Sequence, residues 1–132
     1  MANPVCEVLL SEFPLAAPLE KSPAQTGAVV DFWGVVRETE AGAPISGIEY
    51  EAHREMAEHQ LQIVAEEAFA SFPLQQLVIR HRLGFVAKDE ASLFVRVGCK
   101  HRAEAFRAAI WVVDELKKRA PIWKHPKAAA AP

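Results

Sequence analysis

The chain has 132 residues, of which 51% are hydrophobic, and a formal net charge of −2 at pH 7. This length and composition indicate one folded domain with a sizeable core and argue against a disordered chain. A net charge near zero argues against a general electrostatic attraction to nucleic acid or to a membrane surface.

The two cysteines, Cys6 and Cys99, lie far apart in the sequence. They form neither a disulfide framework nor a CxxC metal motif, so we expect reduced thiols. The sequence shows no secretory leader and no long apolar span. We therefore expect a cytoplasmic protein without a membrane segment.

The first part of the chain predicts mainly strands. Residues 5–10 form a short apolar run that predicts an edge strand. Residues 27–36 are rich in β-branched and aromatic side chains and predict the strongest strand, in which Gly34 indicates either a bulge or a close approach of the backbone. Residues 38–44 are polar and contain glycine and proline, so they predict a loop, and residues 45–51 predict the next strand.

The second part predicts two helices separated by strands. Apolar residues at helical spacing predict a helix over residues 54–71. Residues 74–80 and 91–98 predict two further strands, and residues 101–119 predict the last helix.

This order of elements predicts an α+β fold, with a mainly antiparallel sheet and two main helices packed on it. We expect a single domain over residues 1–125. Residues 126–132 are mostly alanine and proline, and we expect them to form a short disordered tail.

The last predicted helix carries an unusual charge. At 100° per residue, Phe106, Ile110 and Val113 share one stripe, which predicts the buried face. Lys117 lies in the middle of this stripe, and Arg102 lies on it at the other end. Lys117 is either a functional cation or a lysine whose charged end reaches out to solvent, and the pattern leaves both open.

A rigid break follows this helix. Pro121 stops the helix, because proline lacks the N–H group and restricts the residue before it. An apolar pair and then Lys124 come after the break. Lys117 and Lys124 thus stand on the two sides of one turn.

Several cations lie at the predicted ends of elements: Arg37 after a strand, His101 and Arg102 at a helix start, and Lys117 and Lys124 around Pro121. Each alone is an ordinary surface charge, but together they favour a site for a phosphate or carboxylate. Arg102 and Lys117 are fifteen residues apart on one helix, or about 22 Å. Either they serve different sites, or, as we favour, one pocket lies between two subunits.

Metal and thiol chemistry receive little support. The Cys99-Lys100-His101 segment resembles part of a metal site, but zinc needs three or four ligands and no second pair has suitable spacing. A Cys99 nucleophile activated by His101 is also weakly supported, because a cysteine at a strand end is more often a small buried residue.

Four segments resemble the large, catalytic subunit of molybdopterin synthase. They are residues 27–37 (GAVVDFWGVVR), 48–53 (IEYEAH) with the following Met56-Ala57, 101–106 (HRAEAF) and 117–124 (KKRAPIWK). The resemblance runs from about residue 5 to 125, and the last segment is its most specific part.

The resemblance implies an α/β-hammerhead-like fold and an enzyme of molybdenum cofactor biosynthesis. Two sulfurs would be transferred to cyclic pyranopterin monophosphate, which is the substrate, so no resident cofactor or metal is implied. The sulfur donor would be a ubiquitin-like small subunit with a thiocarboxylate on its C-terminal Gly-Gly. Two large subunits would form a homodimer with one small subunit at each end, a heterotetramer.

The resemblance also implies site residues. Lys117 and Lys124 match the family's catalytic lysines. The substrate-binding residues match, beside these two lysines, Val35, Val36, Arg37, His101, Arg102 and His125.

One departure supports a rival hypothesis. Family members continue past the Trp-Lys pair with a longer charged and aromatic segment, whereas here His125-Pro126-Lys127 is followed by alanines. A non-catalytic module that binds the small partner or an anionic pterin is therefore the main alternative. A nucleic-acid-binding domain is a weaker one, since the sequence lacks a basic face with stacking aromatics.

Overall fold

The computed structural model describes residues 4–130 and contains two helices and eight strands. The helices are α1 (Arg54–Ser71) and α2 (Arg102–Arg119). The strands are β1 (Val5–Ser11), β2 (Ala28–Val35), β3 (Thr39–Glu40), β4 (Ala43–Ala52), β5 (Leu74–Arg82), β6 (Gly84–Ala87), β7 (Ala91–Cys99) and β8 (Ile122–Ala128).

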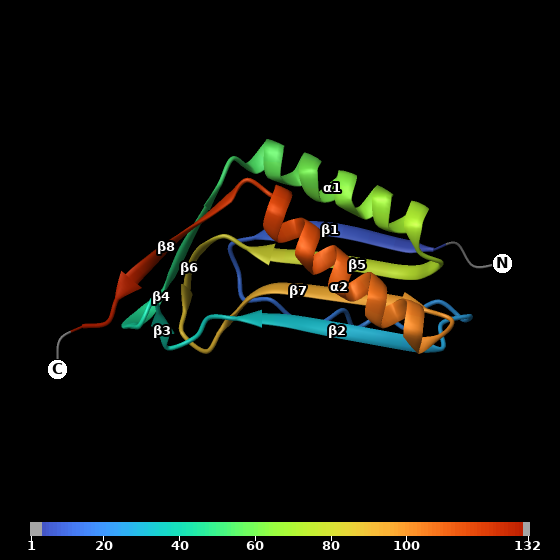
Figure 1. Cartoon of the computed structure of the whole chain (residues 1–132), viewed down its shortest axis with the longest axis horizontal. Coiled ribbons are helices and arrows are strands. Elements are labelled where there is room, and N and C mark those ends of the chain that lie inside the picture. Colours follow the sequence, from blue (N-terminus) through green and yellow to red (C-terminus); the bar gives the residue numbers. More distant parts are fainter. Residues whose placement is uncertain (1–3, 131–132) are drawn as a thin grey trace.

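The strands form two sheets. The first has the order β1-β5-β7-β2, with β1 parallel to β5 and the other pairs antiparallel. The second has the order β3-β4-β6, and β8 also pairs with β4, in antiparallel orientation. Both helices cover the same face of the first sheet, and the second sheet lies at one end of the molecule (Figure 1). The predicted α+β fold, mainly antiparallel with two packed helices, is confirmed.

The larger core lies between the two helices and the first sheet. Its members include Leu61 and Val64 of α1, Ile79 of β5 and Val112 of α2, all at most 1% exposed. A smaller core belongs to the second sheet and contains Val36, Ile45, Ile48, Tyr50 and Val86. Ile122 at the start of β8 packs against both cores. The two sheets therefore meet where α2 ends, beside the predicted lysines.

Of the two alternatives at Gly34, the structure shows the bulge, because the β2–β7 register shifts between Gly34 and Val35. The segment predicted as a loop at residues 38–44 forms a tight hairpin instead. Its short strand β3 pairs with the start of β4, and Ala41 and Gly42 turn the chain with φ of 51° and 80°. The hairpin gives Glu40 a defined position.

The predicted buried stripe of α2 is confirmed at Val113 but wrong at its two larger members. Phe106 and Ile110 are 57% and 63% exposed. The buried face is instead formed by Ala105, Ala108, Ala109, Val112, Val113 and Leu116. Alanines allow α2 to lie close to the sheet, so the helix is rotated away from its larger apolar side chains. Lys117 consequently continues an exposed stripe with Phe106 and Ile110.

The predicted disordered tail at residues 126–132 is also wrong in its first part. Strand β8 extends to Ala128, with Pro126 opposite Ile48 and Lys127 opposite Gly47 of β4. Pairing to a distant strand gives these residues regular structure that their own composition does not predict. Residues 131–132 lie outside the described residues.

Candidate functional site

A cavity beside the predicted lysines lies where the two sheets and α2 meet. Its volume is about 520 Å³, and side chains from α1, α2 and five strands contribute to its lining. Four of the predicted site residues line it: Val35, Arg37, Lys117 and Lys124. The structure therefore brings together residues that are 80 and more positions apart in the sequence.

The turn at Pro121 explains how the two lysines reach one cavity. Helix α2 ends with Ala120 in an extended conformation, and the Ile122 N–H group donates to the Ala120 carbonyl at 2.8 Å. The chain then enters β8, in which Lys124 lies opposite Tyr50 of β4. Lys117 is thus held by the last turn of the helix and Lys124 by a strand register.

The cations of this cavity face a carboxylate of the β3–β4 hairpin. Glu40 lies 3.8 Å from Arg37 and 3.8 Å from Lys124, measured between the nearest nitrogen and oxygen atoms. Its side chain is 28% exposed, whereas Arg37 and Lys124 are 79% and 51% exposed. Glu40 therefore occupies a position between two cations where an anionic ligand would also bind.

His81 was not predicted as a site residue, yet it lines the same cavity. Its ring meets Tyr50 edge-on, with ring centroids 5.3 Å apart. Burial lowers the pKa of the His81 imidazole below its usual value, with an opposing effect from its contact with the Arg82 carbonyl. A sequence signal existed, because His81 continues the alternation of Leu77 and Ile79, where an apolar residue is expected.

We expect this partly buried histidine to make stability depend on pH. The folded pKa is below the unfolded value of about 6.5, so the unfolded chain binds the proton more readily. The contribution is fully present above pH 6.5 and is lost as the pH falls toward the folded pKa. Unfolding by urea at several pH values between about 5 and 8 should show a steeper loss of stability for the wild type than for His81→Gln. Equal slopes for the two proteins would contradict this expectation.

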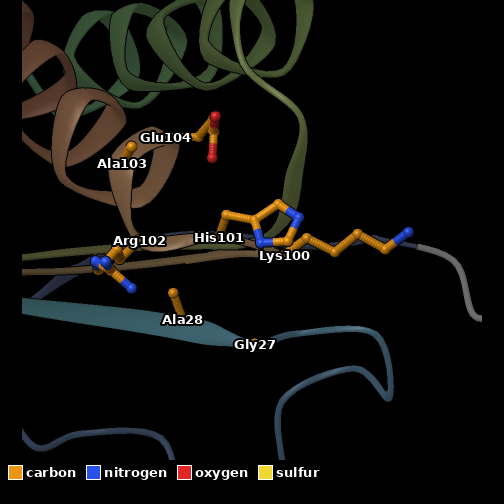
Figure 2. A pocket seen from close by; sticks show the side chains of 7 residues that line it. All are labelled: Gly27, Ala28, Lys100, His101, Arg102, Ala103 and Glu104. Carbon is orange, nitrogen blue, oxygen red and sulfur yellow. The ribbon is translucent and has the colours of Figure 1, made fainter.

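A second cavity of about 430 Å³ lies at the start of α2. It is lined by His101 and Arg102, together with Lys100, Glu104 and the beginning of β2. Figure 2 shows Arg102 extending on one side, near Ala28, and His101 and Lys100 extending on the other. The two predicted groups of cations thus line separate cavities at opposite ends of α2, as the helix length requires.

The α2 N-terminus is electropositive and lacks a side-chain cap. His101 occupies the N-cap position but makes no capping hydrogen bond. Arg102 adds a positive charge where the helix dipole already favours an anion. Lys100 and Arg102 thus outnumber Glu104 in the lining of this cavity, and the balance of charge favours an anion.

Two predicted site residues line neither cavity. Val36 is 2% exposed and belongs to the smaller core. His125 is exposed on β8 and lies 3.4 Å from Glu51. Their contact with substrate stays a prediction. Within this chain, Val36 packs in the smaller core and His125 pairs with Glu51 of β4.

Over residues 4–130, no three His, Cys, Asp or Glu side chains lie close enough together to hold a metal ion. In the same part of the chain, neither helix is long and apolar enough to cross a membrane.

Comparison with known proteins gives a consistent result. The family model described as "MoaE protein" matches residues 11–119. The molybdopterin synthase catalytic subunit of Pyrococcus abyssi is 42% identical over 103 residues, which cover 78% of this chain and 70% of that one. The human protein of the same name is 35% identical over 98 residues, covering 74% and 52% of the two chains.

Solved structures agree with the sequence relatives. The crystal structure of molybdopterin synthase from Staphylococcus aureus matches with a TM-score of 0.85 and 28% identity, over 92% of this chain and 91% of that one. The MoaE protein of Burkholderia ambifaria matches with a TM-score of 0.75 and 29% identity, over 92% and 81%. The resemblance stated from four sequence segments is confirmed. The chain therefore belongs to the MoaE family, the catalytic subunits of molybdopterin synthase, which act in the biosynthesis of the molybdenum cofactor.

Proposed function

We propose that this chain transfers sulfur from the C-terminal thiocarboxylate of a small ubiquitin-like subunit to cyclic pyranopterin monophosphate. The product is the dithiolene of molybdopterin. The observation that carries the proposal is the convergence of Lys117, Lys124 and Arg37 on one cavity from α2, β8 and the end of β2. The pterin enters as the substrate, in the cytoplasm, and no metal or resident cofactor is part of the proposal.

The chemistry of the cavity suits this reaction. The substrate phosphate and the thiocarboxylate are both anions, and Arg37, Lys117 and Lys124 supply cations for them. When the sulfur attacks the pterin side chain, negative charge develops on oxygen, and a fixed ammonium group stabilises it. Lys117 and Lys124 are thus the catalytic residues of the proposal. Val35, at the bulge beside Gly34, forms part of the cavity wall.

A small-subunit partner is part of this proposal. A solved structure from Helicobacter pylori is described as a complex of subunits 1 and 2 of molybdopterin-converting factor. The present chain matches it with a TM-score of 0.66 at 24% identity, so this match supports the fold alone. The thiocarboxylated Gly-Gly end of the partner belongs to our proposal.

We also place the complete site between two copies of the chain. The exposed stripe of α2 carries Phe106 and Ile110 between Arg102 at one end and Lys117 at the other. Ile110 stands near the middle of this span. A two-fold axis near Ile110 would pair two α2 helices in opposite directions, so that Arg102 of one copy approaches Lys117 of the other.

In this arrangement, the cavity at the start of α2 in one copy would lie beside the cavity at the end of α2 in the other copy. His101 and Arg102 of a second copy would add their positive charges to the cavity of Lys117 and Lys124 and bind the substrate phosphate. The apolar stripe would be covered in the same contact. Sedimentation at micromolar concentration should therefore show a dimer, and a strict monomer would contradict the shared site.

The direct test is reconstitution. The purified chain is mixed with a thiocarboxylated small subunit and cyclic pyranopterin monophosphate, and molybdopterin is assayed. Product formation would support the enzyme. Tight binding of the partner without product would favour the alternative, a non-catalytic module for the small partner or an anionic pterin.

Glu40 provides a prediction about affinity. Glu40→Gln removes the carboxylate between Arg37 and Lys124 but keeps the size of the side chain. We expect the KM for the pterin to fall by about two- to fivefold, the range for releasing partly exposed ion pairs. Glu38→Gln is the matched control, since Glu38 is an exposed neighbour for which no ion pair is present among residues 4–130. An increase in KM for Glu40→Gln would show that the carboxylate assists binding instead.

A further inference from the structure

His81 is a partly buried polar side chain that the proposed roles of the lysines leave without a function. It lies on β5 on the same face as Leu77 and Ile79, which are both fully buried. Its ring lies in the wall of the cavity that also contains Lys117 and Lys124. An imidazole in this position costs free energy, because part of a polar ring is removed from water. An apolar side chain would fill the same space at lower cost if the role were purely structural.

The hydrogen bonding of His81 fixes its tautomer. Nδ1 lies 2.8 Å from the carbonyl oxygen of Arg82. A carbonyl oxygen can only accept, so Nδ1 carries the proton and donates it. In the neutral ring, Nε2 then holds a free lone pair, and no protein hydrogen bond to Nε2 is present in the described chain. Burial lowers the pKa of the ring, which keeps this lone pair available at neutral pH.

Titratable and charged groups from several elements line the cavity together with His81. Tyr50 of β4 lies edge-on to the ring. The charged groups are Lys117 on α2, Lys124 on β8 and Arg37 after β2, with Glu40 of the hairpin bound to the last two. The cavity thus combines one neutral base with several cations that can stabilise an oxyanion.

Sulfur transfer from a thiocarboxylate creates a need for such a base. Once the donor sulfur has bonded to a pterin carbon, the partner's terminal acyl group is held to the pterin through a thioester. The bond between the acyl carbon and the sulfur must then break, so that the sulfur stays on the pterin and the partner is released. One water molecule per sulfur must supply the oxygen that completes the partner's carboxylate, and that water must lose a proton.

We propose that His81 is the base that activates this water, an inference that rests on the proposed function. Nε2 takes a proton from the water, and the oxygen of the water bonds to the acyl carbon. The carbonyl electrons move to oxygen, beside the cations, and return to expel the sulfur. The departing sulfur takes the proton from Nε2, and the new carboxylic acid releases its own proton to solvent. The products are the partner's carboxylate and a thiol on the pterin, and His81 is neutral again.

The test separates attachment of sulfur from release of the partner. His81→Asn retains a side-chain N–H group near the position of Nδ1, so it can keep the bond to the Arg82 carbonyl while removing the lone pair of Nε2. In a single turnover with thiocarboxylated small subunit and cyclic pyranopterin monophosphate, intact mass spectrometry of the small subunit follows the covalent adduct. We expect His81→Asn to accumulate the partner–pterin adduct and to release it about 100-fold more slowly than the wild type.

Two further measurements keep the result specific. The wild-type release rate should fall as the pH is lowered through the depressed pKa of His81, and the His81→Asn rate should not follow this change. For His81→Ala, added imidazole should restore release. Ser92→Ala is the control, because its hydroxyl lines the same cavity but is bonded to the Gly34 carbonyl at 3.4 Å, and it should not accumulate the adduct.

The outcomes distinguish the two proposals. Release by His81→Asn at the wild-type rate, or loss of sulfur attachment before any adduct forms, would overturn the role of His81 while leaving sulfur transfer by the wild type established. Absence of both adduct and product in the wild type would overturn the proposed function, and the inference with it.

Discussion

Replacement of Lys117 by alanine is expected to lower the rate of sulfur transfer by at least about 100-fold, the usual effect of removing a group that stabilises charge in a transition state. Lys117 is exposed at the last turn of α2, so its loss removes little buried surface. The melting temperature should therefore change little. Molybdopterin formation by the reconstituted enzyme and a thermal unfolding curve measure the two effects.

Lys118 provides the matched control for this substitution. It is the next residue on α2, its side chain is 72% exposed, and it lies 3.4 Å from Glu115. It lines neither of the two cavities described above. Lys118→Ala removes the same charge from the same turn and should keep most of the activity. Similar losses in both variants would indicate a general effect of charge rather than a catalytic role.

Lys124→Ala should cause a loss of similar size, because Lys124 reaches the same cavity from β8. Its ammonium group also pairs with Glu40, so the variant should be compared with Glu40→Gln to separate the two effects. Activity retained in both lysine variants would contradict the assignment of Lys117 and Lys124 as catalytic residues.

The second large effect concerns the shared site. A dimer made from one Lys117→Ala copy and one Arg102→Ala copy should have about half of the wild-type activity, since a two-fold dimer then contains one intact and one doubly altered pocket. The two homodimers should each be far less active. The reason is geometric: the two residues lie about 22 Å apart along α2 and line different cavities of one copy.

Copies with different affinity tags allow the mixed dimer to be purified by two successive steps. The control mixes Lys117→Ala with Lys124→Ala. Both of these residues line the same cavity of one copy, so neither pocket of that mixed dimer is intact, and no activity should return. If the Lys117→Ala and Arg102→Ala pair also stayed inactive, the site would belong to a single copy.

The sequence by itself determined the elements whose signals are local. Helix α1 has the predicted bounds, and its buried residues, Ala57, Leu61, Val64, Ala65 and Ala68, have the predicted helical spacing. The bulge at Gly34 was one of two alternatives that a glycine inside a β-branched run indicates, and the strand pairing selected it. The break at Pro121 placed two lysines around one turn, and the family resemblance of residues 117–124 gave them a function.

The tertiary structure alone decided which face of α2 is buried. Hydrophobic spacing gives the most weight to large side chains, whereas close packing against the sheet selected three alanines and left Phe106 and Ile110 exposed. That difference turns a predicted core stripe into a surface that a second copy can cover. No local pattern contains this information, because it depends on how closely α2 approaches β2 and β7.

Long-range pairing decided the rest of the site. The register of β8 against β4 places Lys124 opposite Tyr50 and gives residues 126–128 regular structure. The β3–β4 hairpin brings Glu40 between Arg37 and Lys124. His81 follows Ile79 in a buried strand, and its role as a cavity residue emerges only when β5 meets α2 and the second sheet. The sequence determines which residues can carry the chemistry, and contacts between distant segments determine which of them face one another.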